Sequence, residues 1–281
     1  MLGGAELVEI TTSGDRVRGA GDKSRFVKEI EEALLSGEVD LAVHSAKDVP
    51  GMLPDGLEIA AVPPRADPRD VLVGAASLEA LPAGARVGTA SIRRRSQLLA
   101  LRDDIEVVEL RGNVDTRLRK LEDGDYDAIV LAAAGLERLE TATASAPLGG
   151  SGERTSRVPM QDRRPIDIAA MTPAPGQGAL ALEIRADDVA TRSAVERISD
   201  PLAFACLAAE RDCVIALEAT CDTPIGVFAR CEEPRHIRIR AYAGAPDGSV
   251  WIRDELEGGA DAGRALAERM LSAGAAAILA V

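Results

Sequence analysis

The stretch ARVGTASIRRRSQLLALRDDIEVVELRGNVDTRLRKLEDGDYDAIVLAA, residues 85–133, decides the fold class. Apolar runs at 86–90, 105–110 and 127–133 predict strands, and the stretches 92–101 and 114–122 between them predict helices. Strands that alternate with helices of about ten residues indicate βαβ units on a parallel sheet. Ligands of such sheets bind at the carboxyl ends of the strands, where the helix N-termini also point.

The flanking sequence predicts two further units. A helix at 23–35 feeds a strand at 39–44, and residues 172–178 are a Pro- and Gly-rich crossing before a strand at 179–184. Residues 141–165 are predicted to form a mobile surface loop. After residue 200, a helix at 202–217, strands at 225–229, 236–243 and 250–256, and a helix at 261–278 indicate an α+β unit. We therefore predict two α/β domains and a small α+β domain, with boundaries at 1–63 with 179–197, 67–172, and 201–281.

The composition excludes most polyanion binders. The 281 residues carry a formal charge of −13, and only 2% of them are aromatic. An acidic chain with few aromatic faces is a poor match for nucleic acid, which attracts basic side chains and stacks on aromatic ones. The exception is the window 91–120, which contains eight basic and five acidic residues, a net charge of +3. The functional information is expected to lie in this window.

The termini and cysteines favour a cytoplasmic protein. No apolar run approaches the roughly 20 residues of a membrane helix, and the first ten residues lack the pattern of a secretory signal. The cysteine spacings and the presence of only two histidines disfavour a zinc site, and no metal is predicted. In a reducing compartment the four cysteines are expected to be free thiols, and each alone is typical of a small buried hydrophobe: Cys206, Cys213, Cys221 and Cys231.

Arginines follow three consecutive predicted strands. Arg93, Arg94 and Arg95 open the helix after the first, Arg111 and Arg117 follow the second, and Arg138 follows the third. Guanidinium groups beside helix N-termini suit carboxylate or phosphate. A single arginine of this kind is more often part of a solvated helix face paired with Asp or Glu. Their recurrence at three strand ends favours an anion site.

Two other motifs have chemical potential. Asp48 lies in Ser45-Ala-Lys-Asp-Val-Pro50, directly after the strand that ends at His44. That place suits a catalytic carboxylate tuned by Lys47, although spacing alone favours an Asp that caps a turn and a His44 that is merely hydrogen-bonded. Cys221 lies in a predicted turn between a helix and a strand, where an accessible thiol can form a covalent bond.

Six ordered motifs carry a family resemblance. They are FVKEI from residue 26, HSAKDVP from 44, VGTASIRR from 87, RGNVDTRL from 111, PGQGAL from 175 and CDTPIG from 221. Together they resemble porphobilinogen deaminase, also called hydroxymethylbilane synthase, from about residue 6 to the C-terminus. The resemblance implies three domains, the first two like type II periplasmic binding proteins. It also implies a transferase that joins four porphobilinogen molecules into hydroxymethylbilane and releases ammonia, in haem and porphyrin biosynthesis.

The same resemblance implies roles for individual residues. Cys221 matches the cysteine that holds a dipyrromethane cofactor through a thioether, and Asp48 matches the catalytic acid. Lys23 and Phe26 match an active-site loop. Residues that match groups binding the acetate and propionate side chains of cofactor and substrate are Lys47, Ser91, Arg93, Arg94, Arg111, Arg117 and Arg138. The resemblance further implies a monomer that has porphobilinogen as its partner, without nucleic acid or membrane.

The chain also departs from the family pattern. Members usually begin with a Thr-Arg-x-Ser-x-Leu-Ala segment, which supplies a central strand of the first domain and two site residues. That motif is absent from the sequence, so the first domain is expected to be incomplete at its N-terminus. Two alternatives stay open on the residues alone: a non-catalytic protein that binds a small carboxylate, and a decayed paralogue without cofactor.

Overall fold

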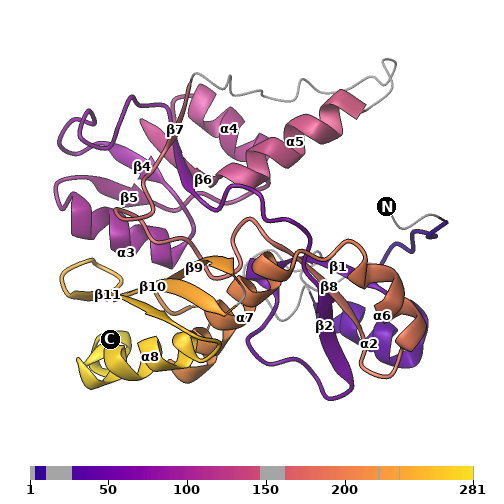
Figure 1. Ribbon diagram of the computed structural model, residues 1–281. Helices are drawn as coiled ribbons and strands as arrows, with labels where there is room; N and C mark the ends of the chain where they lie inside the picture. Colours follow the sequence, from indigo (N-terminus) through magenta and orange to yellow (C-terminus); the bar gives the residue numbers. More distant parts are fainter. Residues whose placement is uncertain (1–3, 11–26, 146–161, 221, 234, 281) are drawn as a thin grey trace.

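A computed structural model of the chain describes residues 4–10, 27–145, 162–220, 222–233 and 235–280 (Figure 1). The strands of these residues form three sheets, each with its own helices. Two of the resulting units are α/β and the third is a small α+β unit. The predicted fold class is therefore confirmed.

The N-terminal sheet is built from two distant parts of the chain. Its order is β1-β8-β2, and β8 pairs antiparallel with both neighbours. The sheet and its helices comprise β1 (Ala42–Ser45), β2 (Leu57–Ala61), β8 (Leu180–Arg185), α2 (Lys28–Ser36) and α6 (Val189–Glu196). Because β8 separates β1 from β2, this sheet forms only after the chain has returned through the crossing at 172–179.

The arginine-bearing sheet has the order β5-β4-β6-β3-β7. Its members and helices are β3 (Asp70–Val73), β4 (Arg86–Gly88), β5 (Glu106–Val108), β6 (Ala128–Ala132), β7 (Arg163–Pro165), α3 (Ile92–Leu101), α4 (Val114–Glu122) and α5 (Ala133–Ser145). β4 is parallel to β5 and β6, as predicted. The sheet also contains two strands that the sequence analysis did not predict, β3 and β7, and both run antiparallel to their neighbours. The chain reaches β3 from β2 through residues 62–69, without the helix that connects parallel neighbours. β3 can therefore pair in the antiparallel direction.

The C-terminal sheet is an antiparallel meander, β11-β10-β9, covered by helices that close an apolar core. Its elements are β9 (Ile225–Glu233), β10 (His236–Gly244), β11 (Trp251–Gly258), α7 (Pro201–Ala216), α8 (Ala262–Ser272) and α9 (Ala275–Leu279). The single final helix predicted at 261–278 is instead α8 and α9. The break falls at Gly274, whose φ of +100° is left-handed and cannot continue a helix.

The predicted loop at 141–165 is partly wrong. Its first five residues, rich in Ala and Thr, continue α5, and 163–165 pair with β3 as an edge strand that tolerates Pro165. Residues 146–161 lie outside the described part of the chain. The predicted bounds of α3 and α4 are confirmed. Each helix begins directly after a residue whose side chain caps it, Ser91 for α3 and Asn113 for α4.

One buried carboxylate joins all three units. The helix α7 lies in the middle of the molecule in Figure 1. Its residue Glu210 is fully buried. Its oxygens accept hydrogen bonds from Arg65 Nη1 at 2.6 Å, from the Gly176 amide at 2.6 Å and from the Ala229 amide at 2.7 Å. Arg65 and Gly176 belong to the two chain segments that connect the α/β units, residues 62–69 and 172–179. Glu210 therefore holds α7 against both crossings.

Candidate functional site

The turn that carries Lys47 and Asp48 follows β1 directly. Residues Ala46–Asp48 form one 3-10 turn, in which Lys47 and Asp48 are half-buried. The turn is anchored by a hydrogen bond of 3.0 Å from the Ala46 amide to the Ala179 carbonyl, next to β8. Asp48 therefore lies at the carboxyl end of a strand, as the sequence predicts.

A buried side-chain contact between His44 and Glu183 joins β1 to β8 just before this turn. His44 Nε2 lies 2.8 Å from Glu183 Oε2, with side-chain exposures of 8% and 0%. The hydrogen-bonded histidine favoured on sequence grounds is confirmed. Glu31 of α2 lies near the pair: burial raises the pKa of Glu31, and repulsion by Glu183 raises it further against attraction to His44. Glu183 Oε1 and Glu31 Oε1 are both buried, and neither has a hydrogen-bond partner in the described part of the chain.

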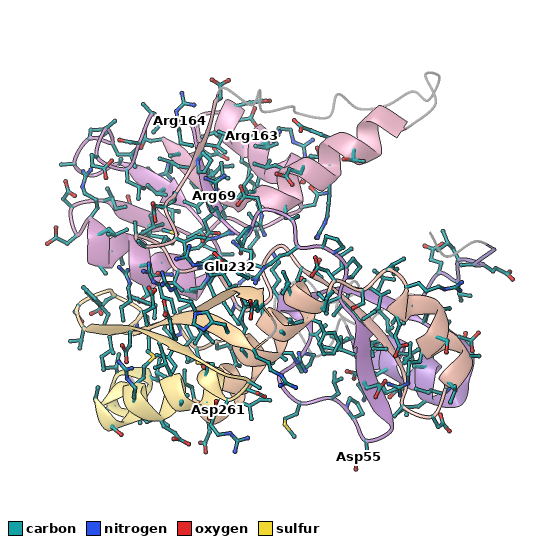
Figure 2. The ribbon with its side chains drawn as sticks, in the orientation of Figure 1. Asp55, Arg69, Arg163, Arg164, Glu232 and Asp261 are labelled. Carbon is teal, nitrogen blue, oxygen red and sulfur yellow. The ribbon has the colours of Figure 1, made fainter. Side chains whose placement is uncertain are left out.

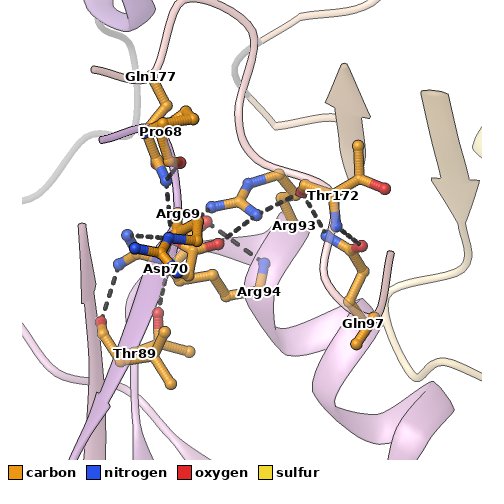
Figure 3. A network of polar contacts seen from close by, with 12 residues as sticks. Pro68, Arg69, Asp70, Thr89, Arg93, Arg94, Gln97, Thr172 and Gln177 are labelled. Atoms are coloured by element: carbon orange, nitrogen blue, oxygen red, sulfur yellow. Dashed lines mark hydrogen bonds and ion pairs between the residues drawn. The ribbon is translucent and has the colours of Figure 1, made fainter. Parts of the chain in front are cut away.

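The arginine cluster surrounds a second buried carboxylate, Asp70, at the start of β3 (Figure 3). Arg93 Nη1 lies 2.7 Å from Asp70 Oδ2, and Arg94 Nε lies 2.9 Å from Asp70 Oδ1. Gln177, above Asp70 in this view, donates to Asp70 Oδ1 at 3.0 Å. Neither arginine is on a solvated helix face, the arrangement that spacing alone favours: both are buried and committed to one acid.

The cluster has more positive than negative charge. Burial alone would raise the pKa of Asp70, but attraction to Arg93 and Arg94 outweighs it and holds that pKa well below its usual range. Burial lowers the pKa of Arg94, and repulsion by Arg93 and Arg117 acts in the same direction against attraction to Asp70. Arg93 Nε is buried and has no hydrogen-bond partner among the described residues. One carboxylate thus faces two guanidinium groups, which leaves a surplus of positive charge.

The other predicted arginines lie at the same strand ends, with different partners. Arg117 donates to the Gly112 carbonyl at 2.7 Å, and burial lowers its pKa. Arg111 is exposed and paired with Glu109 at 2.7 Å. Arg138 of α5 donates to the Gly178 carbonyl at 3.0 Å. Ser91 caps α3, where its hydroxyl accepts from the Arg94 amide at 3.4 Å.

A short glycine-containing segment connects the Asp48 turn to the arginine cluster. Gly176 packs on the turn so closely that a Cβ there would lie 2.9 Å from the Lys47 amide nitrogen. Two residues on, Gly178 receives Arg138, and Gln177 between them binds Asp70. The two halves of the candidate site therefore share one backbone segment as support.

Several predicted site residues lie outside the described part of the chain, namely Lys23, Phe26 and Cys221. The other three cysteines are free thiols, as predicted. No group of three or more potential metal ligands occurs among the described residues, and no helix among them is long and apolar enough to cross a membrane.

Sequence reasoning missed the residues that hold the arginines. Asp70 is the clearest, because an acid at the start of the fully buried run Asp70–Val73 needs a cationic partner, and that signal was present in the sequence. Gln97 and Thr172 exchange two hydrogen bonds, of 2.7 and 3.0 Å, across the crossing. They left no comparable signal, because they are 75 residues apart.

Comparisons with known proteins point to one family. The family described as "Porphobilinogen deaminase, dipyromethane cofactor binding domain" matches residues 2–193, and "Porphobilinogen deaminase, C-terminal domain" matches residues 204–272. A porphobilinogen deaminase of Brevibacillus brevis is 44% identical over 98% of this chain and 86% of its own length. One of Thermus thermophilus is 46% identical over 89% of this chain and 78% of its own.

The likeness to solved structures is weaker. One that concerns glutathione import in Streptococcus mutans aligns with 60% of this chain and 66% of its own, at 11% identity and a TM-score of 0.33, too low to add to the fold described above. The sequence relatives, by contrast, span nearly the whole chain at more than 40% identity. The chain belongs to the porphobilinogen deaminase family.

Proposed function

We propose that this chain is a transferase that joins four porphobilinogen molecules head to tail into hydroxymethylbilane and releases one ammonia with each addition. The observation that carries the proposal is the family match, which covers both the α/β units and the α+β unit. The geometry supports it, because porphobilinogen brings two carboxylates and one amine. The described residues offer the half-buried carboxylate of Asp48 and buried guanidinium groups, both on elements that contact the segment 176–178.

Asp48 is the proposed catalytic residue. Release of ammonia requires a proton on the leaving amine, and the ring cation left behind requires a nearby negative charge. A carboxyl group serves both needs, since it donates a proton and then faces the cation as a carboxylate. The turn after β1 supports this role, because it is fastened to β8 and to Gly176 and so holds Asp48 in one place.

Arginines are proposed to bind the acetate and propionate groups. Arg117 and Arg138 would contact substrate, together with Phe26, while Lys23, Lys47, Ser91, Arg93, Arg94 and Arg111 would contact cofactor. The surplus positive charge around Asp70 supports the binding of carboxylates near this place.

The cofactor is proposed to be dipyrromethane, joined covalently to Cys221. The description of the matched family supports the dipyrromethane itself, and the described residues fit a group with several carboxylates. When bound, it supplies the two linked pyrroles from which the product chain is extended. The protein's part is to bind its carboxylates, orient it and place Asp48 beside the reacting carbon.

We further infer the three-domain division at 1–63 with 179–197, 67–172 and 201–281. It is supported by the three separate sheets, and by β8 lying between β1 and β2. A cytoplasmic monomer without nucleic-acid partners is also proposed. The free thiols support a reducing compartment, and the net charge of −13 disfavours nucleic acid.

Intact-mass spectrometry tests the cofactor proposal. The purified wild-type protein is expected to be heavier than its sequence by two linked pyrroles, and Cys221→Ser is expected to have the sequence mass. Cys213→Ser is the matched control and should keep the extra mass. A wild-type protein at its sequence mass after incubation with porphobilinogen, or a Cys221→Ser protein that retains the addition, would overturn the proposal.

A further inference from the structure

Two thiols from different elements are in contact in the C-terminal unit. Cys206 of α7 and Cys231 of β9 have their Sγ atoms 3.2 Å apart. Cys206 is 6% exposed and belongs to the core between α7 and the sheet, and the half-buried Cys231 packs against that core. The two residues are 25 positions apart, so their meeting results from the fold and not from sequence proximity.

We propose that Cys206 and Cys231 are a reversible oxidation site, which closes to an intramolecular disulfide when hydrogen peroxide reaches it. The overall step is balanced by the oxidant. Two thiols and one peroxide give one disulfide and two waters, so that the sulfur pair loses two electrons and the peroxide oxygens gain them. This proposal is independent of the proposed catalytic function.

The surroundings of the two thiols indicate which one reacts first with peroxide. Cys231 is the more exposed, and the next residue, Glu232, labelled in Figure 2, is exposed to solvent. Burial raises the pKa of Cys206, and its contact with Cys231 raises it further. Cys231 therefore meets peroxide first, forming a sulfenic acid and one water. Cys206 then attacks the sulfenic sulfur, loses its proton and releases the second water.

The backbone at Cys231 can accommodate the new bond. A disulfide needs its sulfurs at about 2.05 Å, so the pair must approach by roughly an ångström. Cys231 pairs with Ile237 of β10, and the register of β9 with β10 is irregular between His236 and Ile237. A strand end next to such an irregularity can shift more easily than a regular ladder. Cys206 is held by its helix, so the movement is expected in β9.

Peptide mapping of the full-length protein tests the proposal. The protein is treated with hydrogen peroxide, blocked with iodoacetamide and digested without reductant. The expected product is a cross-linked peptide pair containing Cys206 and Cys231, two hydrogens lighter than the sum of the free peptides and lost on treatment with dithiothreitol. Cys213→Ser is the matched control from the same helix and should form the same cross-link, whereas Cys206→Ser and Cys231→Ser should not.

The wild-type measurement decides the matter without any variant. Three results would overturn the proposal: both thiols recovered as alkylated peptides after peroxide, Cys231 recovered as sulfinic acid without a cross-link, or a cross-link from either cysteine to Cys213, Cys221 or a second chain. A cross-link between Cys206 and Cys231 that dithiothreitol removes would confirm it.

Discussion

Asp70 is a buried acid paired with two buried guanidinium groups, so its loss should strongly destabilise the fold. Asp70→Asn leaves Arg93 and Arg94 buried without a counter-charge. Removing one partner of a buried ion pair typically costs about 3–5 kcal/mol. We expect a decrease of that size in the free energy of unfolding, measured with urea. Asp67→Asn is the control, because its pair with the 44%-exposed Arg69 should cost about 1 kcal/mol or less. Equal losses in the two variants would contradict the role given to Asp70.

Glu31 is expected to make the stability of the fold depend on pH. Its pKa is raised in the folded protein, so folding favours the protonated form. Stability from this group is present below its unfolded pKa of about 4.3 and is lost as the pH rises through the folded pKa. Glu31→Gln should therefore raise the free energy of unfolding at pH 7 but not at about pH 4. Glu32→Gln, on the exposed side of the same helix, should change little at either pH. A stabilisation of Glu31→Gln that is the same at both pH values would exclude this explanation.

Single residues were also where sequence reasoning was least complete. The positions of Arg93, Arg94 and Arg117 followed from strand ends, since parallel strands place those ends on one edge. Asp70, the partner of Arg93 and Arg94, did not, because β3 joins the sheet from the segment after β2 and runs antiparallel. A local sequence pattern predicts where a side chain lies on its own element, but not which residue from a distant part of the chain it contacts.

Among the elements, the segment 176–178 combines a backbone requirement with a close approach. Gly176 has φ +72° and a space in which a Cβ would lie 2.8 Å from the Ala46 carbonyl carbon. Gly37 has a similar φ of +76° and open space around it. Gly37→Ala should thus cost about 1–2 kcal/mol from backbone strain alone. Gly176→Ala should cost more in urea unfolding and should also lower turnover, because it displaces the Lys47–Asp48 turn. Equal costs would show that the close approach is unimportant.

Elements with local signals were predicted well from sequence. α3 and α4 begin at Ser91 and Asn113, which cap their helices, and the apolar run of β6 was visible directly. β7 and the end of α5 were not predicted, since an edge strand of three residues depends on its partner β3. The interruption at Gly274 was visible as a glycine, but an Ala-rich stretch on both sides concealed it.

At the scale of the whole molecule, Arg65 and Glu210 hold the crossings against α7. Arg65→Met would leave Glu210 buried beside two amide donors but without its cation. We expect a loss of about 3–5 kcal/mol and a broader unfolding transition, because the three units would separate more readily. Arg69→Met, in the same crossing, should have a small effect. A variant Arg65→Met that unfolds like the wild type would contradict the account of the junction.

The central proposal is that Asp48, whose turn and the arginine cluster both contact the segment 176–178, carries the chemistry of porphobilinogen condensation. It is tested most directly by the rate of hydroxymethylbilane formation from porphobilinogen, compared among wild type, Asp48→Asn and the exposed control Asp55→Asn. Because a general acid contributes roughly 10²–10⁴-fold, Asp48→Asn should be at least about 100-fold slower, with its extra cofactor mass retained. Asp55→Asn should match the wild type. An Asp48→Asn protein that carries cofactor and turns over within a few-fold of the wild type would contradict the claim.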